Sequence, residues 1–126
     1  MGDHEKRLNT ESIMKSSLKI MFVAAAWLAI PAFAGAAEVQ ENWTKNCQKC
    51  HGADGSGTTV IGKKLKLKNY TDPVVQAAMS DEEMLKVITE GAKDEAGKST
   101  MPGYGGKMTV DEIRALVGLV RSFKKG

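Results

Sequence analysis

The sequence predicts an all-α domain, and two observations carry that prediction. Apolar residues recur at helical spacing in separate stretches, whereas no run of alternating apolar and polar residues indicates a strand. Two of these stretches begin with a residue pair typical of a helix start, Ser80 with Glu83 and Thr109 with Glu112. Long glycine-rich segments lie between them, so we expect amphipathic helices at each end of the domain and a loop-rich middle.

Four helices are expected in chain order. The first covers residues 38–50, where Val39, Trp43 and Cys47 share one face. A short second helix covers residues 73–79 after an N-cap at Asp72, and a third follows Ser80 and stops at Gly91. The last helix extends to residue 124 and carries an apolar stripe of Ile113, Leu116, Val117, Val120 and Phe123. Residues 52–70 and 92–108 are expected to be loops.

The first 36 residues have the pattern of a secretory signal peptide. Lys15 and Lys19 precede an uncharged stretch, and small residues at 34 and 36 predict cleavage after Ala36. An ordinary signal begins at Met14, which is an alternative start of the chain. The same stretch is marginal as a membrane anchor because Pro31 interrupts it, and a spanning helix takes about 20 apolar residues. We therefore expect a leader over residues 1–36, a domain over residues 37–126 and a periplasmic location, with membrane attachment only if the leader stays uncleaved.

The charge balance of the domain excludes one class of partner. The whole chain has a net charge of +3, with 18 basic and 15 acidic residues. Four of the basic and three of the acidic residues lie in the leader, which leaves +2 for the domain. This weak, mixed charge gives no reason to expect nucleic acid as a partner.

The domain needs something other than its own side chains to complete a core. A small exported domain often depends on a disulfide, a metal or a cofactor. Its only two cysteines, Cys47 and Cys50, are so close in sequence that a disulfide between them would stabilise little. Loops of about 20 residues are also too long for a compact domain with nothing inside it. A large apolar ligand held by those loops resolves both difficulties.

The segment CQKCH at residues 47–51 indicates what that ligand is. Cys-x-x-Cys-His is the attachment signature of c-type haem: the two thiols bind the porphyrin edge, and His51 becomes an axial ligand of the iron. A zinc site would need further ligands, yet no third cysteine exists and the other histidine, His4, lies in the leader. A thioredoxin-like redox pair would require a βαβ unit that the sequence does not show.

The second axial ligand must come from elsewhere in the domain. Methionine is the usual choice when no second histidine exists, and Met79, Met84, Met101 and Met108 follow the leader. We favour Met101, because Pro102 restrains the residue before it to extended geometry inside a loop. Met108 and an open sixth position remain the alternatives.

With these motifs, residues 38–126 resemble a class I c-type cytochrome of the small bacterial, single-haem kind. The resemblance rests on CQKCHG at 47–52, DGSG at 54–57, SDEEMLKVITEG at 80–91 and MPGYGGKMTVDEIRALVGLVRSF at 101–123. It implies a cytochrome c fold, in which the N- and C-terminal helices cross over a covalently bound haem c. Trp43 matches the aromatic position of that crossing, and Leu119 stands where relatives often have its aromatic partner.

The chain departs from the family after the haem motif. Many relatives have Gly-Pro there, and the proline carbonyl accepts the ring N–H of the ligand histidine. Here Lys63 replaces that proline, so the expected acceptor is the carbonyl of Gly62 or Lys63. Tyr70 and Tyr104 are candidates for bonding the haem propionates. The lysines at 63, 64, 66 and 68 are either a solvated face or a basic patch for acidic partners or propionates.

The expected function is that of a one-electron carrier, not an enzyme. We expect one haem c with its iron per chain, and a monomer that docks transiently with redox partner proteins at the exposed haem edge. Two other functions stay open. One is a haem enzyme or gas sensor with an open sixth position, and the other is the haem subunit of a larger exported oxidoreductase.

Overall fold

The structure is a computed structural model that describes residues 32–126, and within that range it is mainly helical. The all-α class predicted from the sequence is confirmed. The elements in chain order are α2 (Ala32–Asn46), α3 (Gln48–His51), α4 (Val60–Lys64), α5 (Pro73–Ala77), α6 (Asp81–Glu90), β1 (Ala92–Lys93), β2 (Ser99–Met101) and α7 (Val110–Ser122).

The helix starts are those that the capping residues predict. The hydroxyl of Ser80 accepts the Glu83 N–H while the Glu83 carboxylate accepts the Ser80 N–H, at 3.1 and 3.0 Å. Thr109 and Glu112 form the same reciprocal pair at the start of α7. Asp72 accepts the N–H of the second residue of α5 at 2.8 Å, with proline at the first helical position. Such pairs satisfy N–H groups that the first turn of a helix leaves free.

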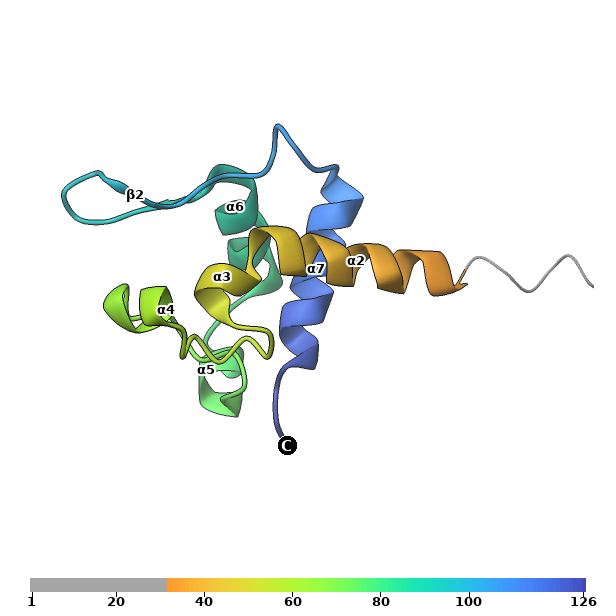
Figure 1. Cartoon of the computed structure of the whole chain (residues 1–126), viewed down its shortest axis with the longest axis horizontal. Helices are drawn as coiled ribbons and strands as arrows, with labels where there is room; N and C mark the ends of the chain where they lie inside the picture. Colours follow the sequence, from red (N-terminus) through yellow and green to blue (C-terminus); the bar gives the residue numbers. More distant parts are fainter. Residues whose placement is uncertain (1–31) are drawn as a thin grey trace, which may run out of the picture. The chain divides into compact units, whose positions relative to one another are not determined.

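The core lies where α2 crosses α7 (Figure 1). Trp43 from α2 and Cys47, which directly follows α2, meet Leu116 and Val120 from α7 in one buried cluster. The inner face of α7 is the predicted stripe at helical spacing, and its residues 113, 116, 117 and 120 are all buried. Removal of this apolar surface from water is the main stabilising contribution that the protein itself supplies.

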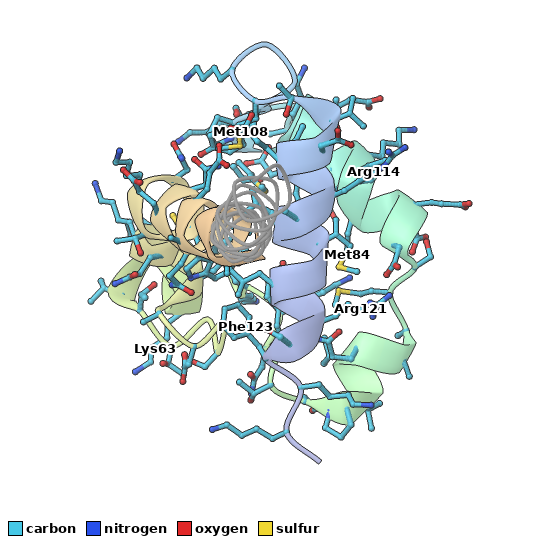
Figure 2. The ribbon with its side chains drawn as sticks, turned by 90° about the vertical axis from the view of Figure 1, so that its right-hand side faces the viewer. Lys63, Met84, Met108, Arg114, Arg121 and Phe123 are labelled. Carbon is cyan, nitrogen blue, oxygen red and sulfur yellow. The ribbon has the colours of Figure 1, made fainter. Side chains whose placement is uncertain are left out.

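The aromatic partner of Trp43 is Phe123 and not the residue at 119. The two rings lie 5.0 Å apart between centroids, with their planes tilted by 55°. Leu119 packs against the same cluster as a half-buried residue, so the expected contact of an aromatic with an aliphatic side chain is supplemented one turn later. Phe123 lies on the α2 side of α7, opposite Arg121 (Figure 2). Gly55 makes room for the Phe123 ring, because a Cβ at residue 55 would lie 2.5 Å from it.

Two elements lie in segments where the sequence predicts only loops. Helix α4 is a short turn of helix inside residues 52–70, begun by the Thr59 hydroxyl, which accepts the Gly62 N–H at 2.9 Å. Strands β1 and β2 pair antiparallel, with Ala92 opposite Met101, and form a hairpin that extends away from the helices (Figure 1). The expectation of no strand was therefore wrong for these few residues.

The predicted leader lies almost entirely outside the described residues. The helix predicted for residues 38–50 begins earlier, at Ala32, and is divided into α2 and α3 at Cys47. Residues 36–126 form one compact unit. Among residues 32–126, no helix is both long enough and apolar enough to span a bilayer.

Candidate functional site

A cavity of about 590 Å³ lies between the crossed helices, α6 and the hairpin. That volume falls within the usual 300–1,000 Å³ of small-molecule and cofactor sites. Its wall comes from every part of the domain. The lining residues are Trp43, Asn46, Cys47, Cys50, His51, Leu65, Lys66, Leu67, Lys68, Tyr70, Ala78, Met79, Glu83, Met84, Val87, Ile88, Ala92, Thr100, Met101, Pro102, Tyr104, Leu116 and Val120.

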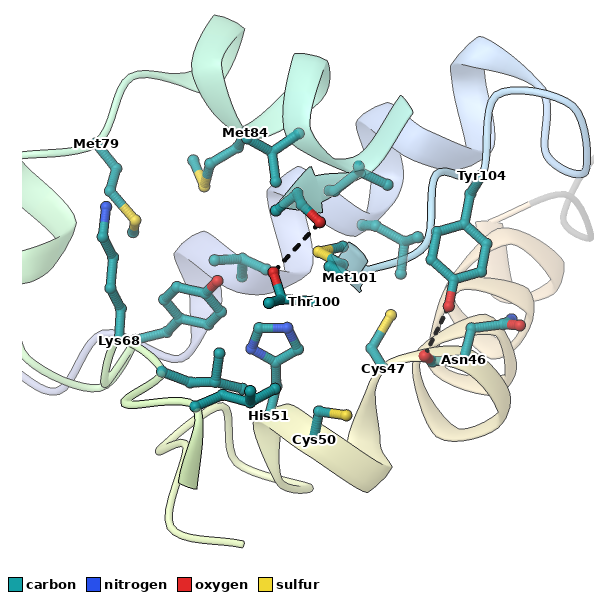
Figure 3. A pocket seen from close by; sticks show the side chains of 18 of the residues that line it. Asn46, Cys47, Cys50, His51, Lys68, Met79, Met84, Thr100, Met101 and Tyr104 are labelled. Atoms are coloured by element: carbon teal, nitrogen blue, oxygen red, sulfur yellow. Dashed lines mark hydrogen bonds between the residues drawn. The ribbon is translucent and has the colours of Figure 1, made fainter. Parts of the chain in front are cut away.

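The haem-attachment motif lies along one wall of this cavity. Cys47, Cys50 and His51 all line it, and both cysteines are free thiols. Helix α3 is a single turn that brings them together: the His51 N–H donates to the Cys47 carbonyl at 3.0 Å. Figure 3 shows both thiols beside the His51 ring, which points into the cavity toward Thr100 and Met101. Burial raises the pKa of Cys47 to about 11, with the neighbouring Cys50 adding to the shift, so its sulfur is a neutral thiol at pH 7.

The backbone after His51 is held by a tryptophan. Gly52 has φ of +84° and ψ of 161°, a conformation essentially restricted to glycine. Its carbonyl accepts the indole N–H of Trp43 at 3.1 Å in a buried hydrogen bond. The His51 carbonyl accepts the Gly57 N–H at 2.8 Å. The imidazole is therefore attached to a backbone segment fixed on both sides.

The His51 ring itself has aromatic neighbours but no hydrogen-bond partner at Nδ1. Tyr70 stacks on it with centroids 5.3 Å apart and planes at 19°, and Trp43 lies 5.9 Å away at 43°. Nδ1 is buried and has no hydrogen-bond partner. The expected bond to the carbonyl of Gly62 or Lys63 is therefore not made. Burial also lowers the pKa of His51 below its ordinary 6.5, which keeps the ring neutral near pH 7 and able to donate a lone pair to a metal.

Met101 lies across the cavity from His51, at the end of β2 (Figure 3). Its loop packs backbone against backbone on the end of α6. The N–H groups of Tyr104 and Gly105 donate to the last carbonyls of that helix at 2.9 and 3.0 Å. A Cβ at Gly91 would lie 2.5 Å from the Met101 oxygen, and one at Gly103 would lie 2.7 Å from the α6 backbone. Two glycines therefore allow the methionine loop to approach so closely.

The other methionines divide into two groups. Met79 and Met84 also line the cavity, on the side of α6, so the sequence underrated them as neighbours of a bound ligand. Met108 is not among the lining residues and packs instead against the core cluster of α2 and α7. This position argues against Met108 as the alternative axial ligand.

The two tyrosines differ in what their hydroxyls do. Tyr104 is buried and donates to the Asn46 carbonyl at 3.0 Å, which connects the methionine loop to the end of α2 (Figure 3). Its proton is thus engaged with the protein, which argues against a role in binding propionates. Tyr70 lines the cavity, and burial raises the pKa of its hydroxyl above the ordinary value, so it stays protonated and able to donate.

The lysine run is split between the cavity and the surface. All four side chains are exposed, but Lys66 and Lys68 also line the cavity, whereas Lys63 and Lys64 lie at the end of α4. Glu83 also lines the cavity, and its pKa lies below 4.5 chiefly because its carboxylate accepts the N–H of the α6 cap residue. Among the described residues, the cavity therefore has two lysines and one carboxylate within its wall.

Gln76 and Arg121 form a clamp that sequence reasoning missed. Gln76 is only 3% exposed, and its amide donates to the carbonyls of Tyr70 and Val120, both at 2.7 Å. The Arg121 guanidinium donates to the carbonyls of Gln76 and Met79 at 2.6 Å each and to the Asp81 carboxylate at 2.7 Å. Most of the acceptors are backbone groups, which leave no pattern in a sequence.

The cavity is partly open to solvent, so it is a site for a ligand and not a closed void in the core. The donor set fits a haem: two free thiols and a neutral imidazole on one wall, and thioethers on the other. Among residues 32–126, no three His, Cys, Asp or Glu side chains come together as a metal site, which disfavours zinc.

Comparison with protein families decides the identity of the domain. Residues 34–120 match the family model described as cytochrome c oxidase, cbb3-type, subunit III. The chain belongs to this family of c-type cytochromes. A comparison with curated proteins found no match.

Solved structures that are similar to this chain support its assignment to the c-type cytochromes. It is similar to the KustC0563 c-type cytochrome, with 35% identity and a TM-score of 0.59 over 68% of this chain and 96% of the other. A tyrosine-to-phenylalanine mutant of that protein matches with 33% identity and a TM-score of 0.58, over 69% and 99% of the two chains. The cytochrome c fold is thus confirmed, and the cofactor is haem c, covalently bound and carrying iron. The cytochrome is an electron-transfer protein that works with redox partner proteins.

Proposed function

We propose that this cytochrome is an exported carrier of single electrons, with one haem per chain and an iron bound by His51 and Met101. The observation that carries the proposal is that both thiols, the imidazole and the Met101 thioether line one cavity. Haem c supplies, when bound, an iron that alternates between the ferrous and ferric states. Methionine ligation favours the ferrous state and thereby a higher reduction potential.

The residues of the cavity have distinct tasks in this proposal. Cys47 and Cys50 attach the haem covalently, so that it is not lost outside the cytoplasm. His51 and Met101 hold the iron from opposite sides and leave no position for a substrate. Lys66 and Lys68, the lysines of the cavity wall, neutralise acidic groups of the haem.

The remaining protein keeps water out and the ligands in place. The buried contact of α2 with α7 covers one part of the cavity, and the glycine-dependent packing of the methionine loop covers another. Because ligands fixed in this way need not move when the charge of the iron changes, electron transfer requires little rearrangement. Partners would dock transiently at the exposed haem edge of a monomer.

Export is the part of the proposal that rests on sequence. Residues 1–36 would serve as a leader that is removed after Ala36, and residues 37–126 would act in the periplasm. The covalent anchorage of the haem suits a compartment where a lost cofactor could not be replaced. Amino-terminal sequencing of the protein from a native membrane-free extract would test the cleavage site directly.

The absorption spectrum of the ferric protein tests the ligation. Met101→Ala should abolish the weak far-red band of methionine bound to ferric iron and convert the spectrum to high spin. Met79→Ala and Met84→Ala, which change other thioethers of the same cavity, should keep the band. A wild-type spectrum that is already high spin would contradict the carrier and favour the enzyme or gas sensor with an open sixth position.

One specific observation favours a second candidate, a haem subunit of a larger oxidoreductase. The matching family is described as a subunit of a cytochrome c oxidase. Size-exclusion chromatography of a native extract, followed by haem staining, separates the two. A stained species at the size of the lone domain supports the carrier, and co-elution with a much larger complex supports the subunit.

A further inference from the structure

The orientation of an axial imidazole is usually fixed by a hydrogen bond from its outer nitrogen. In this chain Nδ1 of His51 is buried and has no such bond. The two carbonyls that could replace the missing proline carbonyl are engaged elsewhere. Gly62 accepts the Leu67 N–H at 2.9 Å, and Lys63 accepts the Lys66 N–H at 3.2 Å. Something other than a hydrogen bond must then set the plane of the His51 ring.

Stacking by Tyr70 is the contact that can do so. The two rings are nearly parallel, at 19°, and their centroids lie 5.3 Å apart. Trp43 lies on the ring more obliquely, at 43° and 5.9 Å. A ring packed against a nearly parallel neighbour cannot turn about its own bond to the backbone without losing that contact. The tilted indole fixes the position of His51, whereas the phenol ring can also fix its plane.

Tyr70 is itself held firmly enough to impose an orientation. Its N–H donates to the Gly55 carbonyl at 2.9 Å, and its carbonyl accepts the Gln76 amide at 2.7 Å. That amide also donates to Val120 in α7, and Arg121 donates to the Gln76 side-chain oxygen at 3.0 Å. The tyrosine is therefore connected by the buried amide of Gln76 to Val120 of the C-terminal helix, which lies 44 residues after Gln76.

We propose that Tyr70 is a positioning residue that sets the plane of the His51 imidazole by stacking, in place of the usual hydrogen bond to Nδ1. The proposal rests on the proposed function, in which His51 is an axial ligand of the iron. The aromatic face of Tyr70 carries this role, and its hydroxyl does not.

The plane of an axial imidazole can be read from the ferric holoprotein. Together with the orientation of the Met101 thioether, it determines the order of the haem methyl resonances in the proton NMR spectrum and the spread of g-values in the frozen-solution EPR spectrum. Neither signal responds to a loss of stability alone. The informative variants are Tyr70→Phe, which keeps the ring, and Tyr70→Leu, which removes it. Tyr70→Phe is thus the matched control, because it deletes the hydroxyl and keeps the stacked ring.

We expect Tyr70→Phe to keep the wild-type methyl order, and Tyr70→Leu to change that order and broaden the g-values. If Tyr70→Leu does not accumulate as holoprotein, Tyr70→Met fills the space with a flexible side chain and should show the same change. An unchanged methyl order in the leucine or methionine variant would overturn the proposal, as would a change in Tyr70→Phe equal to that in leucine. A high-spin wild-type spectrum would instead overturn the His51–Met101 ligation itself, so the two failures are distinguishable.

Discussion

Gly91 is the residue through which the docking of the methionine loop can be weakened most selectively. It ends α6 with φ of +83° and ψ of −176°, a region of backbone space that is essentially restricted to glycine. An alanine Cβ there would also lie 2.5 Å from the Met101 oxygen and 2.7 Å from the Gly103 nitrogen. Both are backbone atoms, so no change of side-chain rotamer can relieve the contact. Gly91→Ala should therefore push the loop that carries Met101 away from the cavity.

The size of the effect follows from the backbone conformation. A non-glycine residue in such a region costs about 1–3 kcal/mol. If the loop can escape this cost by undocking, the ratio of undocked to docked protein rises about fivefold to about 150-fold, since each 1.36 kcal/mol is a factor of ten. The collision with the Met101 oxygen adds to this range.

Imidazole binding to the ferric protein measures that ratio. Added imidazole can occupy the sixth position of the iron only when Met101 has left it, so its apparent affinity increases with the population of the undocked state. We expect Gly91→Ala to bind imidazole more tightly by about the factor above, and to lose far-red absorption only to the extent that the undocked state becomes populated without imidazole. Gly97→Ala is the matched control, because residue 97 has φ of +78° but a Cβ there would meet no atom within 4 Å.

Equal imidazole affinities in Gly91→Ala and Gly97→Ala would refute this reasoning. Such a result would mean that the close approach at Gly91 does not matter. Affinities equal to wild type would show that backbone strain has no effect on the methionine loop either, and affinities equally tighter than wild type would show that strain acts alone. A tighter affinity in Gly97→Ala alone would show that the hairpin, and not the end of α6, controls the loop.

Three further predictions concern the protein around the site. Arg121→Lys should lower the free energy of unfolding by about 1–3 kcal/mol, because lysine cannot donate to all the acceptors of the guanidinium. The midpoint of thermal unfolding should fall by roughly 4–8 °C per kcal/mol, and an unchanged midpoint would contradict the clamp. Trp43→Phe keeps an aromatic ring but leaves the Gly52 carbonyl without its buried donor, so chemical denaturation should show a free energy of unfolding lower by about 1–3 kcal/mol. The control is Trp27→Phe, which lies in the predicted leader and should have no effect on the cleaved protein. The pKa of Glu112 lies below its ordinary 4.5 because its carboxylate accepts the N–H of the helix cap residue, Thr109. The stability from this bond is therefore fully present above about pH 4.5 and is lost as the pH falls through the lowered pKa. Glu112→Gln should flatten the acid side of the plot of unfolding free energy against pH, and a plot parallel to that of wild type would exclude this contribution.

Local patterns predicted the starts of α5, α6 and α7, because each depends on residues at most three positions apart. The first helix begins at Ala32 and not at residue 38, as the sequence had predicted. The capping pairs of α6 and α7 were found for this reason, as was Asp72 before α5. The short elements escaped because they are too small to show a period. Strands β1 and β2 have two and three residues, and α4 is hidden among glycines and lysines.

Contacts between distant segments were only partly predictable. The resemblance to a known family placed α2 across α7 and pointed to Trp43, but it suggested Leu119 as the partner, whereas the ring that meets Trp43 is Phe123. Spacing alone cannot show which turn of α7 faces the indole. The role of Arg121 was missed because its partners are mostly backbone carbonyls, which every residue has.

The long-range hydrogen bonds also bear on the order in which the protein is made. Tyr104 bonds to Asn46 and Gln76 to Val120, 58 and 44 residues apart along the chain, and Phe123 packs on Trp43. Such contacts have high contact order and form late, after most of the polypeptide has been synthesised. Cys47 and Cys50 are synthesised long before α7, the helix that completes the cavity. In a chain whose α7 has not yet packed against α2, both thiols are uncovered, so attachment of the haem before folding would meet no steric obstacle.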